Sequence, residues 1–127
     1  DDKNLIMSVH SYEPMEFTHQ GADWDGDGVP RPPTDFTDDM KYEIQLVFAM
    51  VKKYQETYGR PVWIGEFGAM KPNTPAGARA KYADFIVETM KDAKCGWCWW
   101  EFQSGFGLYS TSSDEWVDDA LMEALLK

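Results

Sequence analysis

Three short apolar runs alternate with three longer amphipathic segments along the chain. The apolar runs cover residues 5–12, 60–68 and 96–102, and their length and composition are typical of buried strands. The intervening segments place apolar residues at steps of three and four, which is the period of a helix. The pattern therefore predicts an α/β fold of the order βαβαβα, whose strands lie parallel because such units join through crossovers of one hand.

Capping signals set the expected ends of the first two helices. The first is predicted over residues 38–58, with Thr37 as its N-cap and Gly59 just beyond its end. The second is predicted over residues 76–93, because Thr74 and the proline after it suit a cap and a first helical position.

A capping box marks the expected start of the last helix. Ser112 and Glu115 have the spacing at which two side chains cap the first turn reciprocally. The buried face of this helix is predicted to contain Trp116, Val117, Ala120, Leu121, Ala124 and Leu125.

Composition indicates one compact domain and excludes several kinds of partner. The 127 residues are 43% hydrophobic, which is enough for a core. The formal net charge of −10 argues against nucleic acid and anionic membranes, which require positive charge, and allows a neutral polymer such as a glucan. No apolar run approaches the roughly 18 residues of a membrane span, and no signal peptide is visible. The start at Asp1, without Met, predicts a processed product or a fragment.

The second run delivers one carboxylate at its tip. Glu66 lies between Gly65 and Gly68, and the C-terminal ends of the strands form the active-site face of a (β/α) barrel. The first run ends with His10 and Tyr12, which are two residues apart and therefore share a face. Taken alone, Glu66 is better explained as a surface residue just past a strand end.

The third run ends with Trp100 and completes a set of groups that suits a sugar. A carboxylate, hydrogen-bonding groups that hold it and a flat apolar ring for a pyranose face are what a glycan site needs. Each residue alone has an ordinary interpretation as core packing, but three strands that end this way favour a shared site.

Four stretches carry a resemblance to a known family. They are V-H-S-Y-E-P at residues 9–14, F-T-H-Q-G-A at residues 17–22 with Trp24, P-V-W-I-G-E-F-G-A at residues 61–69, and W-E-F at residues 100–102 followed by G-F-G-L-Y at residues 105–109. In this order they resemble the last three strands of a family 5 glycoside hydrolase of the cellulase type. The resemblance implies that residues 1–127 are a single C-terminal fragment of a (β/α)8 barrel, a half-barrel with parallel strands that forms a partial TIM barrel.

The resemblance also implies roles for individual residues. It implies that Glu66 is the nucleophile of a retaining endo-β-1,4-glucanase, that His10 and Tyr12 support it, and that Trp100 stacks under the reacting sugar. No metal or organic cofactor is implied, the substrate class is plant cell-wall polysaccharide, and the location is extracellular. Trp24 and His19 are candidates for a further sugar subsite, although Trp24 could simply pin its loop.

The chain departs from the family in its length. A complete barrel typically needs about 250 residues, and strands one to five, with the general acid/base of the fourth, have no counterpart here. Glu13 and Glu16 lie in the loop after the first strand, and strand alternation is expected to turn Glu101 away from the pocket. The chain therefore looks like the nucleophile half of an enzyme.

This incompleteness leaves a different class open, namely a non-catalytic sugar-binding or self-assembling half-barrel. Three strands cannot close a barrel, so we expect a homo-oligomer or a complementary N-terminal half-barrel as partner. The inward side chains that would lack an opposing wall are expected around Met7, Val9, Ile64 and Cys98.

Two further motifs have weaker interpretations. Asp23, Asp25 and Asp27 imitate the start of a calcium loop, but position twelve is not the required glutamate, so a solvated acidic loop is favoured and calcium stays open. Cys95 and Cys98 have redox-motif spacing, yet three residues of extended strand hold them about 10 Å apart, too far for a disulfide. We expect packed thiols, with Cys98 on the face of Trp100, and Trp97 and Trp99 facing the helices.

Overall fold

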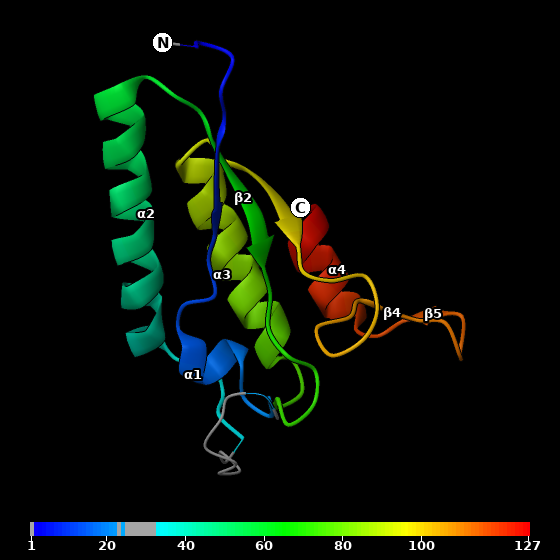
Figure 1. Ribbon diagram of the computed structural model, residues 1–127. Helices are drawn as coiled ribbons and strands as arrows, with labels where there is room; N and C mark the ends of the chain where they lie inside the picture. The colour runs from blue at the N-terminus through cyan, green and yellow to red at the C-terminus, as the bar shows by residue number, and fades with distance from the viewer. Residues whose placement is uncertain (1, 23, 25–32) are drawn as a thin grey trace.

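The computed structural model describes residues 2–22, 24 and 33–127 and contains one parallel three-stranded sheet. Its order is β1 (Met7–His10), β2 (Val62–Phe67) and β3 (Gly96–Trp99). Helix α2 (Asp38–Tyr58) leads from β1 to β2, and α3 (Ala78–Asp92) leads from β2 to β3. The α/β prediction with parallel strands is thus confirmed. In Figure 1, β2 (green) and β3 (yellow) point toward the end of the molecule that carries the short α1 (Met15–Thr18).

Helix α2 has the bounds that its sequence predicts. Gly59 has a left-handed φ of 60° and donates its N–H to the carbonyl of Gln55 over 2.9 Å, which ends the helix as a C-terminal glycine should. Thr37 occupies the N-cap in an extended conformation, although its side chain makes no capping hydrogen bond. The apolar side chains of α2 that the fold buries are Met40, Ile44, Phe48 and Val51.

Helix α3 begins later than expected. Gly77 is the N-cap, and Thr74 does not cap the helix because its hydroxyl donates to the carbonyl of Met70. The predicted start at residue 76 was therefore wrong by two residues.

The expected start of the last helix was also wrong. Helix α4 is Asp119–Leu126, and the carboxylate of Asp118 caps it by accepting the N–H of Leu121 over 3.1 Å. An aspartate caps as well as a serine, so Asp118 competes with Ser112 for the role. The segment that precedes the helix forms an antiparallel hairpin of β4 (Tyr109–Ser110) and β5 (Glu115–Trp116). Trp116, which was predicted to be buried, is exposed in this hairpin.

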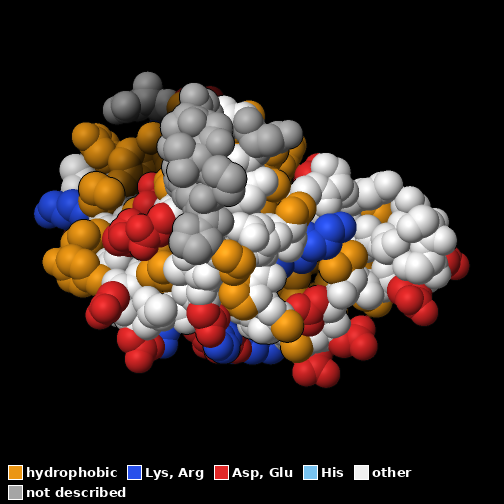
Figure 2. Space-filling view, turned by 90° about the horizontal axis from the view of Figure 1, so that it is seen from below, with side chains coloured by type: hydrophobic (Ala, Val, Ile, Leu, Met, Phe, Trp, Pro, Cys, Tyr) orange, Lys and Arg blue, Asp and Glu red, His pale blue; other side chains and the backbone are white. Residues whose placement is uncertain are grey.

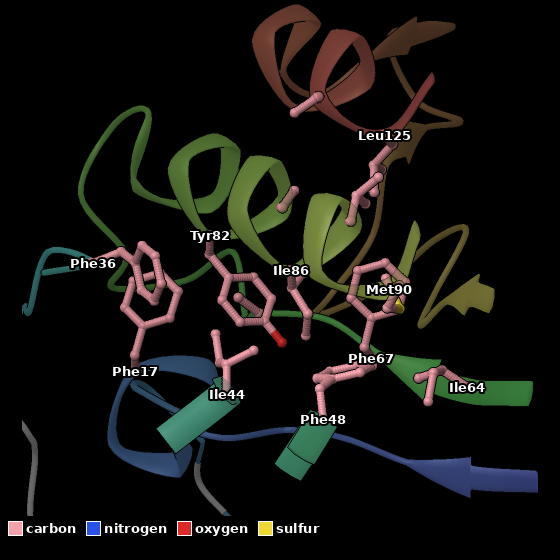
Figure 3. Close-up of a cluster of buried hydrophobic side chains, with 14 of the residues drawn as sticks. Phe17, Phe36, Ile44, Phe48, Ile64, Phe67, Tyr82, Ile86, Met90 and Leu125 are labelled. Atoms are coloured by element: carbon pink, nitrogen blue, oxygen red, sulfur yellow. The ribbon is translucent and has the colours of Figure 1, made fainter. Parts of the chain in front are cut away.

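The core is built around α3 and takes in side chains from the sheet, α2 and α4. Figure 3 shows α3 lying between α4 on one side and the strands with α2 on the other. Large side chains that are almost fully buried include Phe17, Ile44, Phe48, Ile64, Phe67, Tyr82, Ile86, Met90 and Leu121. Burying an aliphatic or aromatic side chain of this kind contributes about 2 kcal/mol, so this cluster is the main source of stability.

The other face of the sheet is open among the described residues. The sequence predicts that β2 is buried on both faces, but Trp63 is 39% exposed, so this prediction was wrong. The expectation that Ile64 and Val9 lie on the inward face without an opposing wall was also wrong. Ile64 is fully buried on the helix face, and Val9 packs against the same core. Trp97 and Trp99 pack against the core, as predicted, and both cysteines are free thiols. Cys95 packs against the core, but the prediction of a packed thiol was wrong for Cys98, which is exposed because it lies on the open face of the sheet.

No helix in the described part of the chain is both long enough and apolar enough to span a bilayer.

Candidate active site

A bulge at the end of β2 turns Glu66 off the helix face. Val9 pairs with Ile64, but the next residue, His10, pairs with Glu66, so β2 carries one extra residue at Gly65. Side chains alternate along a strand, and one inserted residue reverses the alternation beyond it. Ile64 therefore lies in the core while Glu66, with its side chain 26% exposed, is directed to the strand ends. Gly65 leaves room for this, since a Cβ there would lie 2.8 Å from the Ser8 hydroxyl oxygen.

Tyr12 and His10 meet Glu66 at a single oxygen atom. The Tyr12 phenol donates a hydrogen bond of 2.9 Å to Oε2 of Glu66, and Nδ1 of His10 lies 3.4 Å from the same atom. The backbone fixes this arrangement, because the N–H of Ser11 donates to the Glu66 carbonyl over 2.9 Å. The carboxylate is thus held by two side chains from the neighbouring strand and the segment after it.

Burial and negative charge both act on Tyr12. Burial raises the pKa of the Tyr12 phenol well above its ordinary value, and the hydrogen bond to Glu66 raises it further. Tyr12 is therefore a neutral donor at any physiological pH. It can hold the carboxylate in place without adding negative charge to the site.

An aromatic cluster surrounds Tyr12. The ring of Phe106 lies 5.9 Å from that of Tyr12 and 5.5 Å from that of His19, in edge-to-face arrangements. Trp24, which is 59% exposed, lies 6.4 Å from His19 and 6.5 Å from Phe106. The structure thus joins His19 and Trp24 to the surroundings of Tyr12 through Phe106, which the sequence reasoning did not single out.

Trp100 follows β3 and stays close to the end of β2. The backbone N–H of Trp100 donates to the Phe67 carbonyl over 2.8 Å, and the residue is 44% exposed. A Cβ on Gly68 would lie 2.2 Å from the Trp100 carbonyl oxygen, closer than real contacts allow. The glycine after the strand is therefore required for the close approach of the two strand ends that carry Glu66 and Trp100.

The expectation for Glu101 was wrong. Strand β3 ends at Trp99, so strand alternation does not reach Glu101 and cannot turn it away. Glu101 is half-buried, and it lies close enough to Tyr12 for its charge to contribute to the raised pKa of the phenol. This end of the molecule is acidic, and Figure 2, which views it from below, shows acidic side chains among hydrophobic ones.

The solvated acidic loop stays a prediction, with calcium as its alternative, because Asp23, Asp25 and Asp27 lie outside the described residues. Within the described ranges, no group of three or more His, Cys, Asp or Glu side chains could hold a metal ion.

A second residue that the sequence reasoning missed is Arg79. It lies on the buried face of α3 at 5% exposure. A single cation on an otherwise apolar helix face, three residues before the buried Tyr82, was the available signal.

Comparisons with known proteins point to one family. The sequence model for Cellulase (glycosyl hydrolase family 5) matches residues 1–105. Crystal structures of Cel5A from Thermotoga maritima are similar, in complex with cellobiose (TM-score 0.90, 35% identity) and with mannotriose (TM-score 0.86, 34% identity). Endoglucanase A of Clostridium longisporum is 29% identical over 134 residues and covers 100% of this chain.

The chain spans only part of each of these proteins. The match to the Cel5A structures includes 98% of this chain but only 40% of each Cel5A chain. The match to Endoglucanase A covers 25% of that protein. The strands and helices described above therefore correspond to a part of a TIM barrel, which agrees with the half-barrel prediction.

Proposed function

Because the chain belongs to the cellulase family, glycosyl hydrolase family 5, we propose that it supplies the nucleophile half of a retaining endo-β-1,4-glucanase. The observation that carries this proposal is the convergence of Tyr12 and His10 on Oε2 of Glu66 at the C-terminal end of parallel strands. A carboxylate that is oriented by neighbouring donors and open to solvent is suited to attack an anomeric carbon.

The reaction has two steps. Glu66 attacks the anomeric carbon, a bond forms between its oxygen and that carbon, and the glycosidic bond breaks as a carboxylic acid protonates the leaving oxygen. Water then attacks the same carbon, the ester bond to Glu66 breaks, and the second carboxylate takes the proton from the water. Tyr12 keeps Glu66 oriented throughout. The second carboxyl group, which must lie about 5 to 5.5 Å from Glu66, is assigned to the complementary part of the barrel.

A β-1,4-glucan chain is the favoured substrate. Trp100 offers a half-exposed indole ring beside the strand ends, and Trp24 offers a second ring near His19. Aromatic rings stack on the apolar faces of pyranoses, and the neutral polymer suits an acidic surface. Glucan and mannan are both considered, because the related Cel5A was solved with cellobiose and with mannotriose. A polymer of this size stays outside cells, so the proposed function places the chain in the extracellular space.

A complementary half-barrel is the proposed partner, with a second copy of the chain as the alternative. Both β1 and β3 are edge strands in the described sheet, and edges of this kind pair readily. A groove of about 210 Å³ also opens between β1 and α2, with apolar walls that include Met7, Val9, Val47 and Met50. In a closed barrel both features would be covered by neighbouring strands and helices.

The second candidate function is sugar binding without hydrolysis. It is favoured by the exposure of Trp24 and Trp100 together with the lack of an assigned acid/base in this chain. General acid/base assistance typically contributes a factor of about 100 to 10,000, so the chain alone should show little or no turnover in either case.

Fusion to the first five βα units of a family 5 cellulase separates the two functions. Under the proposal, the fused protein hydrolyses a soluble β-1,4-glucan and Glu66→Gln abolishes this turnover, since an amide cannot attack the anomeric carbon. Glu16→Gln, on the exposed part of α1, is the matched control and keeps full turnover. Undiminished hydrolysis by Glu66→Gln would contradict the proposal. Glucan binding without turnover in the fused protein would favour the second candidate.

A further inference from the structure

Arg79 is a buried cation at the first turn of α3, hydrogen-bonded to the segments that follow β2 and β3. Burial lowers the pKa of its guanidinium to about 10, so it remains charged at neutral pH. Among the described residues no carboxylate hydrogen-bonds it, and Asp118 acts on it only through its charge.

The guanidinium gathers backbone carbonyls from two separate segments. Its Nε donates to the Ala69 carbonyl over 3.0 Å, in the segment after β2. Its Nη2 donates to the carbonyls of Phe106 over 2.6 Å and Gly107 over 3.0 Å, in the segment after β3. The same guanidinium lies 5.4 Å from the centre of the Trp99 ring.

Fold stability alone gives little reason for a charge at this position. The N-terminal turn of a helix disfavours a cation, because the helix dipole is positive there. Burying an ion is costly, and apolar residues of similar volume often replace buried charges without loss of stability. A planar fork of donors, however, fixes several acceptors in one geometry, which an apolar side chain cannot do.

The residues whose carbonyls Arg79 holds are connected to Glu66 by direct contacts or by a short stretch of chain. The Phe106 carbonyl also accepts the indole N–H of Trp99 over 3.0 Å, so the backbone of Phe106 is held by two donors. The ring of the same residue packs on Tyr12, which donates to Glu66. Ala69 lies three residues after Glu66 on the other segment that Arg79 holds.

We propose that Arg79 is a positioning residue, which ties the segment after β2 to the segment after β3 and thereby sets Phe106 against Tyr12. Its effect on turnover rests on the proposed function of Glu66. Its effect on the position of Phe106 does not, because that is a property of the chain itself.

The direct test is the contact between two rings, measured by proton nuclear Overhauser effects in the chain. Arg79→Met keeps an apolar stem of similar length and removes the donors, and we expect it to abolish the effect between Phe106 and Tyr12 and to shift the Trp99 indole proton. Contacts within the core, such as those of Ile44 and Ile86, should persist. Arg60→Met, at the opposite end of β2, is the matched control and should leave both signals unchanged.

A conservative variant distinguishes the loss of these hydrogen bonds from a general loss of the fold. Arg79→Lys retains the charge and can reach part of the carbonyl set, so it should restore the contact between Phe106 and Tyr12 in part. An unchanged contact in Arg79→Met would overturn the proposal. Unfolding of both variants would also overturn it, because the residue would then act through stability alone.

Turnover by the fused protein gives a second readout. A misplacement of about 1 Å in a catalytic group can cost about 100-fold in rate, so kcat should fall by up to about this factor in Arg79→Met and recover partly in Arg79→Lys. An unchanged kcat would contradict the proposal. If Glu66→Gln retained turnover, the proposed function would fail, and the ring contact would still decide the role of Arg79.

Discussion

The phenol of Tyr12 and the carboxylate of Glu66 form a hydrogen bond of 2.9 Å although 54 positions separate the two residues in the chain. The bulge at Gly65 makes this contact possible, because it turns Glu66 away from the core that buries Ile64. The parallel pairing of β1 with β2 brings Tyr12 to the same strand end. The site thus depends on sheet register as much as on the identity of its residues.

Removal of the Tyr12 hydroxyl should reduce turnover without unfolding the chain. Tyr12→Phe keeps the ring against Phe106 and His19 but leaves Glu66 without its nearest donor. We expect kcat of the fused protein to fall by about 100-fold, the typical cost of a misoriented catalytic group. Steady-state kinetics on a soluble glucan measure this, with Tyr42→Phe on the exposed face of α2 as control. A kcat equal to that of the control would show that the hydrogen bond does not orient the nucleophile.

A methyl group at Gly68 should push the ends of β2 and β3 apart. The added Cβ of Gly68→Ala would lie 2.2 Å from the Trp100 carbonyl oxygen, so the backbone must move. We expect a loss of about 1 to 3 kcal/mol in the free energy of unfolding, measured by urea denaturation. In Gly105→Ala the new Cβ would lie 3.4 Å from the flexible end of Met70, so this control should change stability by less than about 0.5 kcal/mol. Equal stability of the two variants would contradict the close approach.

Tyr82 carries a buried hydroxyl that makes no hydrogen bond of good geometry among the described residues, although the backbone of Gly68 lies near enough to act on its pKa. Figure 3 shows this residue reaching from α3 into the apolar cluster. Tyr82→Phe removes this poorly paired buried group, and we expect the free energy of unfolding to rise by about 1 kcal/mol. Tyr42→Phe, which is exposed, is again the control. A loss of stability in Tyr82→Phe would mean that the hydroxyl has a partner in solution.

The same residue predicts an alkaline pH dependence. Burial raises the pKa of the Tyr82 phenol far above its ordinary value of 10.0. Above about pH 10 the unfolded chain therefore releases this proton while the folded chain keeps it, and stability falls as the pH rises. Urea unfolding from pH 9 to pH 11 should show a smaller loss in Tyr82→Phe than in the unmodified chain, with the effect of Tyr12 remaining in both. Equal losses would contradict the burial of the phenol.

The isolated chain should associate in solution. The edge strand β1 and its exposed neighbours Leu5 and Ile6 form an apolar margin that soluble monomers rarely present. Sedimentation equilibrium at micromolar concentration should give a mass above the 14.6 kDa of one chain. Ile6→Lys should weaken association, while Leu126→Lys, at the end of α4, should not. A clean monomer mass with cooperative unfolding would show that the three-stranded unit is self-sufficient.

The sequence predicts those parts of the fold that local rules decide. Hydrophobic periodicity and the glycine at position 59 were sufficient for both ends of α2, and the alternation of runs was sufficient for the parallel α/β order. The last helix was misjudged because two capping residues compete, and the hairpin that separates Ser112 from Asp118 depends on contacts between strands. Such competition is settled by tertiary packing rather than by spacing.

The candidate site was predictable only in its main outline. The proximity of His10, Tyr12 and Glu66 follows from the convergence of parallel strand ends, whereas their catalytic roles stay predictions. The bulge that turns Glu66 away from the core face of Ile64 is a single extra residue without a clear sequence signal. The carbonyl contacts of Arg79 join segments that lie far apart in the chain, so no local pattern could indicate them.

Trapping of the covalent intermediate tests the central claim most directly. A 2-deoxy-2-fluoro-β-cellobiosyl fluoride slows both steps, but its fluoride leaves without help from an acid, so an ester on the nucleophile should accumulate. Mass spectrometry of the fused protein, followed by peptide mapping, should find one cellobiosyl group on Glu66, and none in Glu66→Gln. A fused protein that hydrolyses glucan but carries the label on another carboxylate, or on none, would contradict the assignment of Glu66 as the nucleophile.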